Sequence, residues 1–291
     1  MNINYVANGL GAQSMYLLYL ASQRVIPATV SITADTGWED DSDMCDGTKT
    51  TASAFFRSHV EPFAAKHGIA AYFVRSVDRD GSPLPALGDR LAALAEIGTT
   101  AGVPLFGSQG GRQIQSCTDK WKIRAMKQQA RRLGATHARS AQGIHYGEAA
   151  RRVKGEYIGS EDGYSIYKPV ITVKGVPTTI KWMSHYYPLV DLKMAREDVK
   201  EQMDWLGIPY LTSSECSGCP HADAWRWLRR TPGTIERVAQ IEDKFNGAFF
   251  FTDRRRPLRD VIAEMRAAAM EADFIEKDQA DFGCTNGVCG E

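Results

Sequence analysis

Hydrophobic positions in the first hundred residues follow two alternating patterns. Short runs rich in Val, Ile, Tyr and Phe predict strands, and longer segments with apolar residues every three to four positions predict helices. Alternating strands and helices are typical of a parallel sheet covered on both faces. The pattern therefore predicts an α/β fold with a doubly wound, mostly parallel, Rossmann-like sheet. Strands are expected at residues 3–7, 29–34 and 70–74, and helices at residues 15–21, 48–67 and 83–97.

The rest of the chain reads as a continuation of the sheet followed by a helical end. A loop at residues 98–111 precedes a helix that is capped by Thr118 or Asp119. We expect an α/β domain at residues 1–192 and a helical, cysteine-bearing lobe at residues 193–291. Further predicted elements are a strand end at 141–144, an exposed insertion at 154–163, a hairpin at 173–179, a short strand at 249–251, and helices at 194–206, 222–228, 235–245 and up to about 270.

A glycine loop, Asn-Gly-Leu-Gly-Ala-Gln-Ser, joins the first predicted strand to the first predicted helix. Glycine lets a backbone approach a phosphate closely, and the N–H groups at a helix start point towards it. Ser14 stands where an N-cap or a phosphate-contacting hydroxyl is wanted. Two interpretations stay open, a nucleotide-binding loop or a tight connection. The candidate nucleotide-binding residues of the loop are Asn8, Gly9, Leu10, Gly11, Gln13 and Ser14.

The second predicted strand ends in Asp35, Thr36 and Gly37. Ligands of open α/β sheets bind outside the carboxyl ends of the strands, so these residues are expected beside the glycine loop. Asp35 is a candidate acceptor for a ribose hydroxyl or an adenine amine. The alternative is a turn aspartate that caps the next helix. Asp35, Thr36 and Gly37 therefore join the candidate nucleotide-binding residues.

Composition narrows the class of protein. The chain has 291 residues, 43% of them hydrophobic, and 35 Lys and Arg balance 35 Asp and Glu. Zero formal net charge gives no global attraction to nucleic acid or membrane, although a local basic face is compatible with it. The sequence has no run apolar enough to span a bilayer and no secretory pattern at its start. We therefore expect a cytoplasmic protein with reduced thiols and no membrane partner.

Cysteines form the second candidate site. Cys216 and Cys219 are two residues apart in a turn, which presents both sulfurs to one metal or cluster, and Cys284 and Cys289 lie near the end of the chain. A [4Fe–4S] cluster held by Cys117, Cys216, Cys219 and a C-terminal cysteine, Cys284 or Cys289, is the preferred interpretation. A tetrathiolate zinc site and redox thiols are the alternatives. Cys45 is interpreted as a bystander, and His221 as too close to the pair to be a ligand.

Cations cluster around Cys117. Arg112, Lys122 and Arg124 flank this cysteine and the long loop, and we expect some of them to contact an anion. Cys117 is expected at a helix N-terminus, where the dipole and nearby cations lower the pKa of a thiol. The cationic strip continues along the same helix, and a solvated basic face is the alternative interpretation. The strip consists of Lys120, Lys122, Arg124, Lys127, Arg131 and Arg132.

Five segments in this order resemble the phosphoadenosine phosphosulfate (PAPS) reductase family of the adenine-nucleotide α-hydrolase-like superfamily. The resemblance spans most of the chain and is closest to a phage and bacterial branch of that family. It implies the nucleotide α-hydrolase variant of the Rossmann-like fold and an adenine nucleotide such as ATP. The segments are Gly9-Leu10-Gly11-Ala12-Gln13-Ser14, Ala34-Asp35-Thr36-Gly37-Trp38-Glu39, Cys117-Thr118 with Trp121-Lys122-Ile123, Cys216-Ser217-Gly218-Cys219-Pro220, and Cys284 with Cys289-Gly290.

The resemblance leads to a functional hypothesis. The chain is expected to be an enzyme that acts at the α-phosphate side of an adenine nucleotide, with Arg112 and Lys122 neutralising phosphate charge and Cys289 handling sulfur. Arg124 is expected to contact the nucleotide, and Cys284 to be the fourth cluster ligand. The chain ends Val-Cys-Gly-Glu, without the histidine of sulfonucleotide reductases. ATP-dependent sulfur transfer to a nucleic-acid component is therefore favoured over PAPS reduction with a thioredoxin-like reductant.

A binding module without turnover, with structural zinc, is the rival from another class. The sequence leaves a homo-oligomer open.

Overall fold

The computed structural model describes residues 1–153, 155–173, 176–213 and 215–272. Cys284 and Cys289, both expected at the site, lie outside the described residues. Among the helices that the structure describes, none combines the length and the apolar character needed to cross a membrane.

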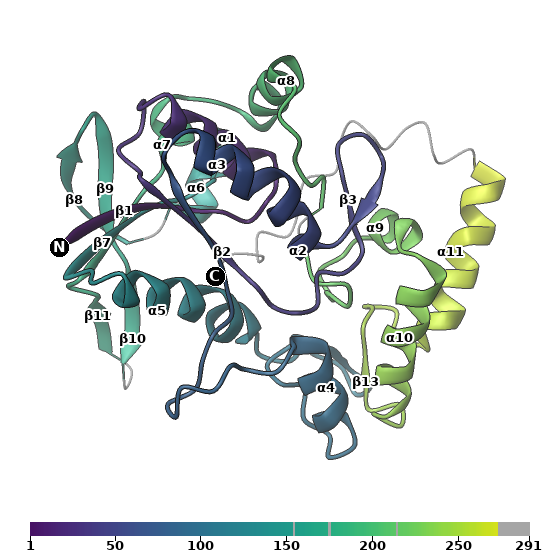
Figure 1. Cartoon of the computed structure of the whole chain (residues 1–291). Coiled ribbons are helices and arrows are strands. Elements are labelled where there is room, and N and C mark those ends of the chain that lie inside the picture. Colours follow the sequence, from purple (N-terminus) through teal and green to yellow (C-terminus); the bar gives the residue numbers. More distant parts are fainter. Residues whose placement is uncertain (154, 174–175, 214, 273–291) are drawn as a thin grey trace.

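A seven-stranded sheet forms the centre of the protein (Figure 1). Its strand order is β5-β2-β1-β7-β12-β9-β8, and the first five strands run parallel. β1 pairs with β2 on one side and β7 on the other, so the order of the chain reverses at the β1–β7 pair. Ligands of open α/β sheets bind at such a point. The parallel strands are β1 (Asn2–Ala7), β2 (Val30–Ala34), β5 (Ala70–Val74), β7 (His137–Ala141) and β12 (Met183–Tyr186).

The α/β class and the mostly parallel sheet are confirmed, and one edge of the sheet differs from expectation. Residues 154–163 were predicted to be an exposed insertion, yet β8 (Glu156–Glu161) is the antiparallel edge strand of the main sheet, paired with β9 (Tyr164–Lys168). The prediction missed it because an edge strand with one solvated face is polar. The predicted hairpin is confirmed by the antiparallel pair β10 (Val170–Val173) and β11 (Val176–Thr179).

Helices cover both faces of the sheet (Figure 1). α1 (Ala12–Ser22) packs on one face, where Leu17 and Leu18 join Val6 of β1 in a buried cluster. α5 (Arg124–Arg132) packs on the other face, where Ala130 joins Tyr5 of β1 and Ile32 of β2. Residues 3, 5 and 6 of β1 thus alternate between the two clusters, as the pleat of a strand requires. The arrangement is compatible with a Rossmann-like fold.

The helix expected at residues 48–67 is shorter and interrupted. α2 (Ala52–Phe55) runs through a π-helical turn, Phe56–Val60, into α3 (Glu61–Lys66). Pro62 lies at the start of α3 and has no N–H to donate to the preceding turn, which accounts for the wider winding there. A second π-helical turn, Thr118–Ile123, leads into α5.

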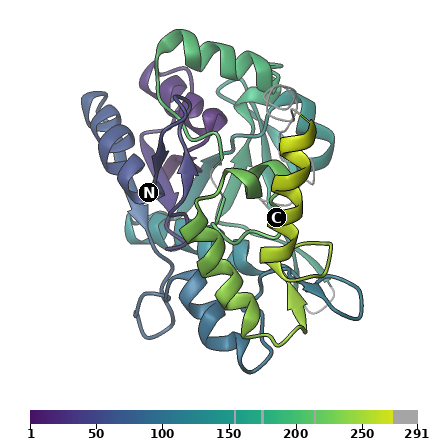
Figure 2. The same ribbon diagram turned by 90° about the vertical axis from the view of Figure 1, so that its right-hand side faces the viewer.

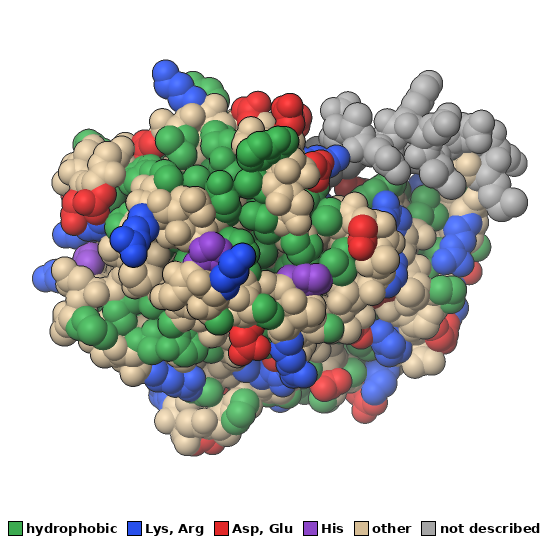
Figure 3. Space-filling model, turned by 45° about the horizontal axis from the view of Figure 1, so that its top comes forward, with side chains coloured by type: hydrophobic (Ala, Val, Ile, Leu, Met, Phe, Trp, Pro, Cys, Tyr) green, Lys and Arg blue, Asp and Glu red, His purple; other side chains and the backbone are tan. Residues whose placement is uncertain are grey.

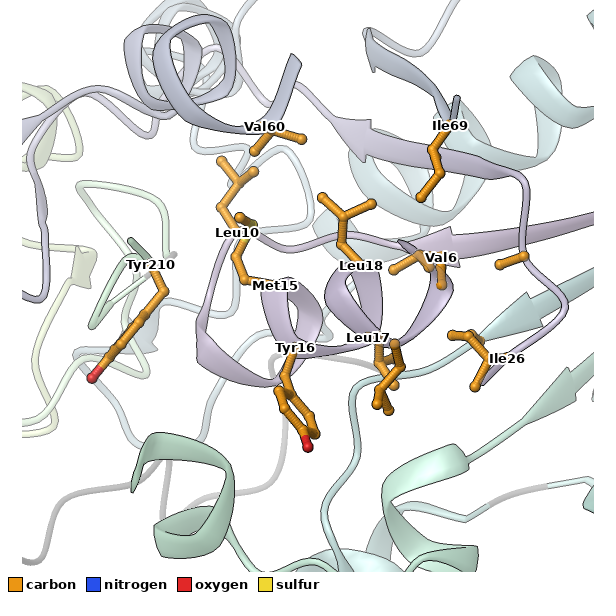
Figure 4. Packing of buried hydrophobic residues seen from close by; sticks show 14 of the residues in the cluster. Val6, Leu10, Met15, Tyr16, Leu17, Leu18, Ile26, Val60, Ile69 and Tyr210 are labelled. Carbon is orange, nitrogen blue, oxygen red and sulfur yellow. The ribbon is translucent and has the colours of Figure 1, made fainter. Parts of the chain in front are cut away.

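The glycine loop contributes to the core through its one large apolar side chain. Leu10 is fully buried and points towards Val60, beside Met15 of α1 (Figure 4). Tyr210 lies at the margin of the same cluster. The buried Leu10 side chain therefore anchors the loop in the hydrophobic core. Its position is fixed by hydrophobic contacts as well as by hydrogen bonds.

A second cluster holds the helices after residue 220 together. α10 (Pro232–Asp243) and α11 (Leu258–Ala272) lie side by side (Figure 2), and α9 (Ala224–Arg229) packs against α11. This cluster also takes Leu87 and Leu91 from α4 (Leu87–Ala95). The short pair β6 (Phe106–Gly107) and β13 (Phe249–Phe250) ties the loop at residues 98–111 to the same region.

Hydrophobic packing crosses the boundary predicted at residue 192. α8 (Arg196–Leu206) contributes Val199 and Met203 to the cluster around α1, and α4 belongs to the cluster of the later helices. The two predicted domains therefore share both of their larger cores. The remaining short elements are β3 (Ser42–Asp43), β4 (Lys49–Thr50), η3 (Tyr146–Glu148), α6 (Ala149–Arg152) and α7 (Pro188–Asp191).

Candidate functional site

The glycine loop is held rigidly at the carboxyl end of β1. The buried Asn8 side chain accepts a hydrogen bond from the N–H of Leu10 at 2.8 Å and donates to the Ser31 hydroxyl at 3.3 Å. Leu10 has a φ of +67°, and its carbonyl accepts from the N–H of Leu211 at 2.9 Å. Asn8 and Leu10 thus shape the loop from within. That they also contact a nucleotide stays a prediction.

The start of α1 is the part of the loop that presents N–H groups. Gly11 is the N-cap residue, so the expectation that Ser14 caps this helix is wrong; Ser14 lies in its first turn. Gly143, after β7, lies so close that a Cβ there would be 3.2 Å from the Ser14 nitrogen and 3.3 Å from the Gln13 Cβ. The start of α1 therefore lies at the point where the strand order of the sheet reverses, between β1 and β7. Backbone amides placed this way form an anion-binding position.

Asp35 has a partner that its local sequence does not indicate. One carboxylate oxygen accepts from the Gly37 N–H at 2.6 Å, and the other pairs with Arg75, which follows the neighbouring strand β5, at 2.5 Å. The first contact is the turn geometry that the sequence left open as an alternative. The second contact places the Arg75 cation beside the end of β2, the strand next to the one that leads into the glycine loop. Nucleotide contacts of Asp35, Thr36 and Gly37 stay predictions.

Thr36 connects the end of β2 with the cysteines. It is buried, and its hydroxyl accepts from the Cys216 thiol at 3.5 Å. The same sulfur lies 3.9 Å from a carboxylate oxygen of Glu39, which pairs with Lys122 at 2.8 Å. Lys122 was expected near Cys117, and its position beside Cys216 was not foreseen. A cation, a carboxylate and a thiol thus converge at the edge of the sheet.

Three of the five cysteines expected at the site line one cavity of about 40 Å³. Cys117 comes from the turn that precedes α5, and Cys216 and Cys219 come from the turn that precedes α9. The N–H of Cys219 donates to the Cys216 carbonyl at 3.0 Å, which closes this turn. Cys45 is exposed and does not line the cavity, as expected of a bystander. Thiols far apart in the sequence therefore meet beside Thr36.

Burial dominates the acid–base state of these thiols. It raises the pKa of the Cys117 thiol above its usual value and that of Cys216 to about 12, and the attraction of Lys122 offsets this only in part. The expectation of a lowered pKa at Cys117 is wrong, because desolvation outweighs both the nearby cation and the helix start. Without a metal these two thiols are protonated at neutral pH.

The three cysteines are chemically suitable ligands for an iron–sulfur cluster or for zinc. Within residues 1–272, apart from the gaps, no three His, Cys, Asp or Glu side chains lie close enough together to hold a metal ion as they stand. Three cysteines nevertheless line one cavity, and thiolates are the usual ligands of both. A metal binds the deprotonated thiolate, so loading would release protons from these buried groups. Cys284 and Cys289 lie outside the described residues.

His221 belongs to the rim of the cavity, although sequence reasoning assigned it no role. Its ring contacts the Arg112 guanidinium, with Nε2 2.6 Å from Nη2, and the side-chain amide oxygen of Gln115, Oε1, lies 3.1 Å from the same ring nitrogen. Burial and Arg112 lower the pKa of His221 to about 4, so the ring is neutral at pH 7. Arg112 also donates to the Pro104 carbonyl at 3.1 Å. The sequence Cys-Pro-His, which places this residue directly after the cysteine turn, could have indicated its position at the cavity.

Arg124 lies elsewhere. It pairs with Asp78 at 3.3 Å and lines a separate groove along α5, whereas Lys122, two residues earlier, lines the cysteine cavity. The structure therefore brings Lys122, Cys117, Cys216 and Cys219 together with Thr36 and leaves Arg124 outside this group.

Comparisons of the chain with models of known families, with curated proteins and with solved structures find no significant match. The function is therefore argued from the geometry of the glycine loop and the cysteine cavity.

Proposed function

We propose that this protein is an adenine-nucleotide-binding enzyme that couples chemistry at the α-phosphate to sulfur transfer, with a nucleic-acid component as the acceptor. The proposal includes a [4Fe–4S] cluster held by Cys117, Cys216 and Cys219, with Cys284 as the fourth ligand. It follows the resemblance to the PAPS reductase family and its nucleotide α-hydrolase variant of the Rossmann-like fold.

One observation carries the proposal. Cys216 donates a hydrogen bond to Thr36, so the thiol cavity borders the end of β2, and β2 is the direct neighbour of the strand that ends in the glycine loop. Leu211, five residues before Cys216, is hydrogen-bonded to Leu10 of that loop. A nucleotide at the start of α1 and sulfur chemistry at the cavity would therefore share one edge of the sheet.

The chain's own groups have distinct roles in this proposal. The first-turn amides of α1 hold phosphate oxygens. Lys122 and Arg112 stabilise the negative charge that develops as an oxygen of the nucleic-acid acceptor attacks the α-phosphorus and pyrophosphate leaves. Neutral His221 orients Arg112. Burial of the cavity keeps water from competing with the sulfur nucleophile, which displaces AMP from the adenylated acceptor. When bound, the cluster would supply sulfur or electrons, and Cys289 is the proposed carrier of the sulfur.

The test measures iron, sulfide and zinc in protein purified without oxygen. Wild type is expected to be brown, with a broad visible absorption band and labile sulfide. Cys216→Ser is expected to lose the colour and most of the iron, because it removes a central ligand, while Cys45→Ser keeps both. Binding of a fluorescent ATP analogue to the same variants shows whether the nucleotide site survives without the cluster.

Three outcomes would contradict the proposal. Full iron content in Cys216→Ser would remove this residue from the ligand set. One zinc and no iron per chain, without turnover, would favour a nucleotide-binding module. Thioredoxin-dependent release of sulfite from PAPS would make the protein a PAPS reductase.

A further inference from the structure

A second groove lies along the outer face of α5, away from the cysteine cavity. Its volume is about 450 Å³, larger than that of the cavity. The residues that matter for its chemistry are Asp119, Arg124, Lys127, Arg131, Arg132 and Trp182.

The groove concentrates positive charge in a chain whose formal net charge is zero. α5 carries four cations and no acid, and Lys181, next to Trp182, is exposed. Among the described lining residues only Asp119 is acidic. On the face in Figure 3, Lys and Arg are interspersed with Asp and Glu. With 35 charges of each sign in the chain, this basic run is a local feature that favours a polyanion.

Both walls of the groove are fixed in place. On one side the Gln128 amide accepts from the Val77 N–H at 2.9 Å and donates to the Val77 carbonyl at 2.8 Å. On the other side the Arg131 guanidinium lies over the Trp182 ring, 3.8 Å from its centroid, and donates to the Ala135 carbonyl at 3.0 Å. A planar cation stacked on an indole is a surface on which nucleobases stack. The aromatic residue distinguishes this groove from a merely solvated basic face.

One helical segment connects the groove to the cysteine cavity. Cys117 precedes the π-helical turn that contains Lys122, and that turn runs directly into α5. At about 1.5 Å per residue, the end of α5 lies about 22 Å along the helix from Cys117. The length of α5 itself is about 13 Å. A strand lying along α5 would therefore have one end directed towards the thiols.

We propose that the α5 groove binds the phosphate backbone of a nucleic-acid strand and stacks a base on the Arg131–Trp182 pair. The proposal rests on the proposed function, because it supplies the nucleic-acid acceptor for the cysteine cavity. Arg124, which the cysteine cavity leaves out, is then a backbone-contacting residue. The bound strand is positioned by its phosphates, so the groove contributes affinity more than sequence selectivity.

The test uses the full chain and fluorescent 20-nucleotide single strands, one of RNA and one of DNA, with anisotropy measured between 50 and 200 mM NaCl. Binding is expected to weaken with salt, because displaced counterions are released. The double variant Arg131→Ala/Arg132→Ala is expected to bind about tenfold more weakly. Its slope of log K against log salt should be smaller by about 1.4, since each single-strand phosphate contact contributes about 0.7.

A matched control removes the same charge from the other side of the sheet. Arg57 and Lys66 are exposed on the helices that pack with α1, and Arg57→Ala/Lys66→Ala is expected to bind like wild type. Trp182→Leu separates stacking from charge: affinity should fall with an unchanged salt slope. A stronger effect on one of the two polymers identifies whether the acceptor is RNA or DNA.

The proposal would be overturned if the charge variant and its control weakened binding equally. It would also be overturned if the protein bound vesicles of anionic lipid and neither oligonucleotide. Iron content and ATP-analogue affinity of Arg131→Ala/Arg132→Ala are expected to equal those of wild type. Failure of the groove is therefore distinguishable from failure of the cysteine site, which Cys216→Ser tests.

Discussion

The glycine loop and the cysteine cavity lie at the same edge of the sheet, yet different parts of the chain stabilise them. In the loop, the groups offered to a ligand are main-chain N–H groups, and Leu10 holds them in place by donating its N–H to the Asn8 side chain and accepting from the Leu211 N–H. Around the cavity, the groups are side chains: Thr36, Glu39 and Lys122 surround the Cys216 sulfur. Ligand binding at the loop should thus depend on its backbone, and ligand binding at the cavity on its side chains.

The difference separates two kinds of substitution. Adding a Cβ at a close backbone approach should affect the loop's ligand, because main-chain N–H groups are its binding groups. Around the cavity, packing and buried charge determine the stability of the fold. Substitutions there should therefore change the free energy of unfolding more than ligand affinity. Three predictions test this division, and they are ordered from the largest expected effect to the smallest.

Gly218→Ala is expected to have the largest effect. Gly218 lies in the turn between the two cysteines, and an added Cβ would collide with the buried Trp38 ring. Overpacking of this kind lowers the free energy of unfolding, here by about 3 kcal/mol. Urea denaturation measures the loss, and the iron content of the variant should fall with it. A free energy of unfolding equal to that of wild type would show that the Trp38 ring can move to accommodate the added methyl group.

Glu242→Gln tests buried charge in the same region. The Glu242 carboxylate accepts from the N–H groups of Phe251, at 2.8 Å, and Leu258, at 2.5 Å, and so ties the start of α11 to α10. Burial raises its pKa from 4.5 to about 7. The folded state therefore holds this proton over a pH range in which the unfolded state has lost it. The free energy of unfolding of wild type should fall by about 2 to 3 kcal/mol between pH 4.5 and 7 and then level off.

In Glu242→Gln this pH-dependent component should disappear. The variant loses one acceptor at every pH, which costs about 1 kcal/mol. Urea titrations at pH 4.5, 6 and 8 distinguish the two effects, since only the first depends on pH. An identical pH slope in wild type and variant would exclude Glu242 as its source.

Gly143→Ala has the smallest expected effect on the fold and a specific effect on the ligand. The new methyl would lie 3.2 Å from the Ser14 nitrogen and cover an amide at the start of α1. Affinity for an ATP analogue should fall roughly tenfold, or about 1.4 kcal/mol, with iron content unchanged. Gly233→Ala, where a Cβ meets no atom within 4 Å, is the control. Unchanged affinity in Gly143→Ala would remove the α1 start from the nucleotide site.

Local patterns in the sequence predict the parts of this molecule that local physics determines. The β1–α1 unit, the strands that flank it and the hairpin after residue 170 follow from periodicity and glycine placement, and the structure confirms them. The turn of Cys216 and Cys219 also follows from its residues. These features depend on contacts between near neighbours in the chain.

The features that were missed depend on contacts between distant residues. Arg75 pairs with Asp35 only because β5 lies beside β2, and His221 meets Arg112 across more than a hundred residues. Glu242 looks like a solvent-exposed position of a helix until α11 folds over it. The pKa of Cys117 was wrongly predicted for the same reason, since its burial comes from remote segments.

The central place of β1 has a consequence for biosynthesis. Its two neighbours reach it at very different times, because β2 begins at Val30 and β7 at His137. At about 5–20 residues per second, one edge of β1 waits roughly 5 to 20 seconds on the ribosome for its partner. During that interval the nascent chain exposes an unpaired strand edge, which is prone to association with other chains. We therefore expect newly made protein to depend on chaperones more than its finished, fully paired sheet would suggest.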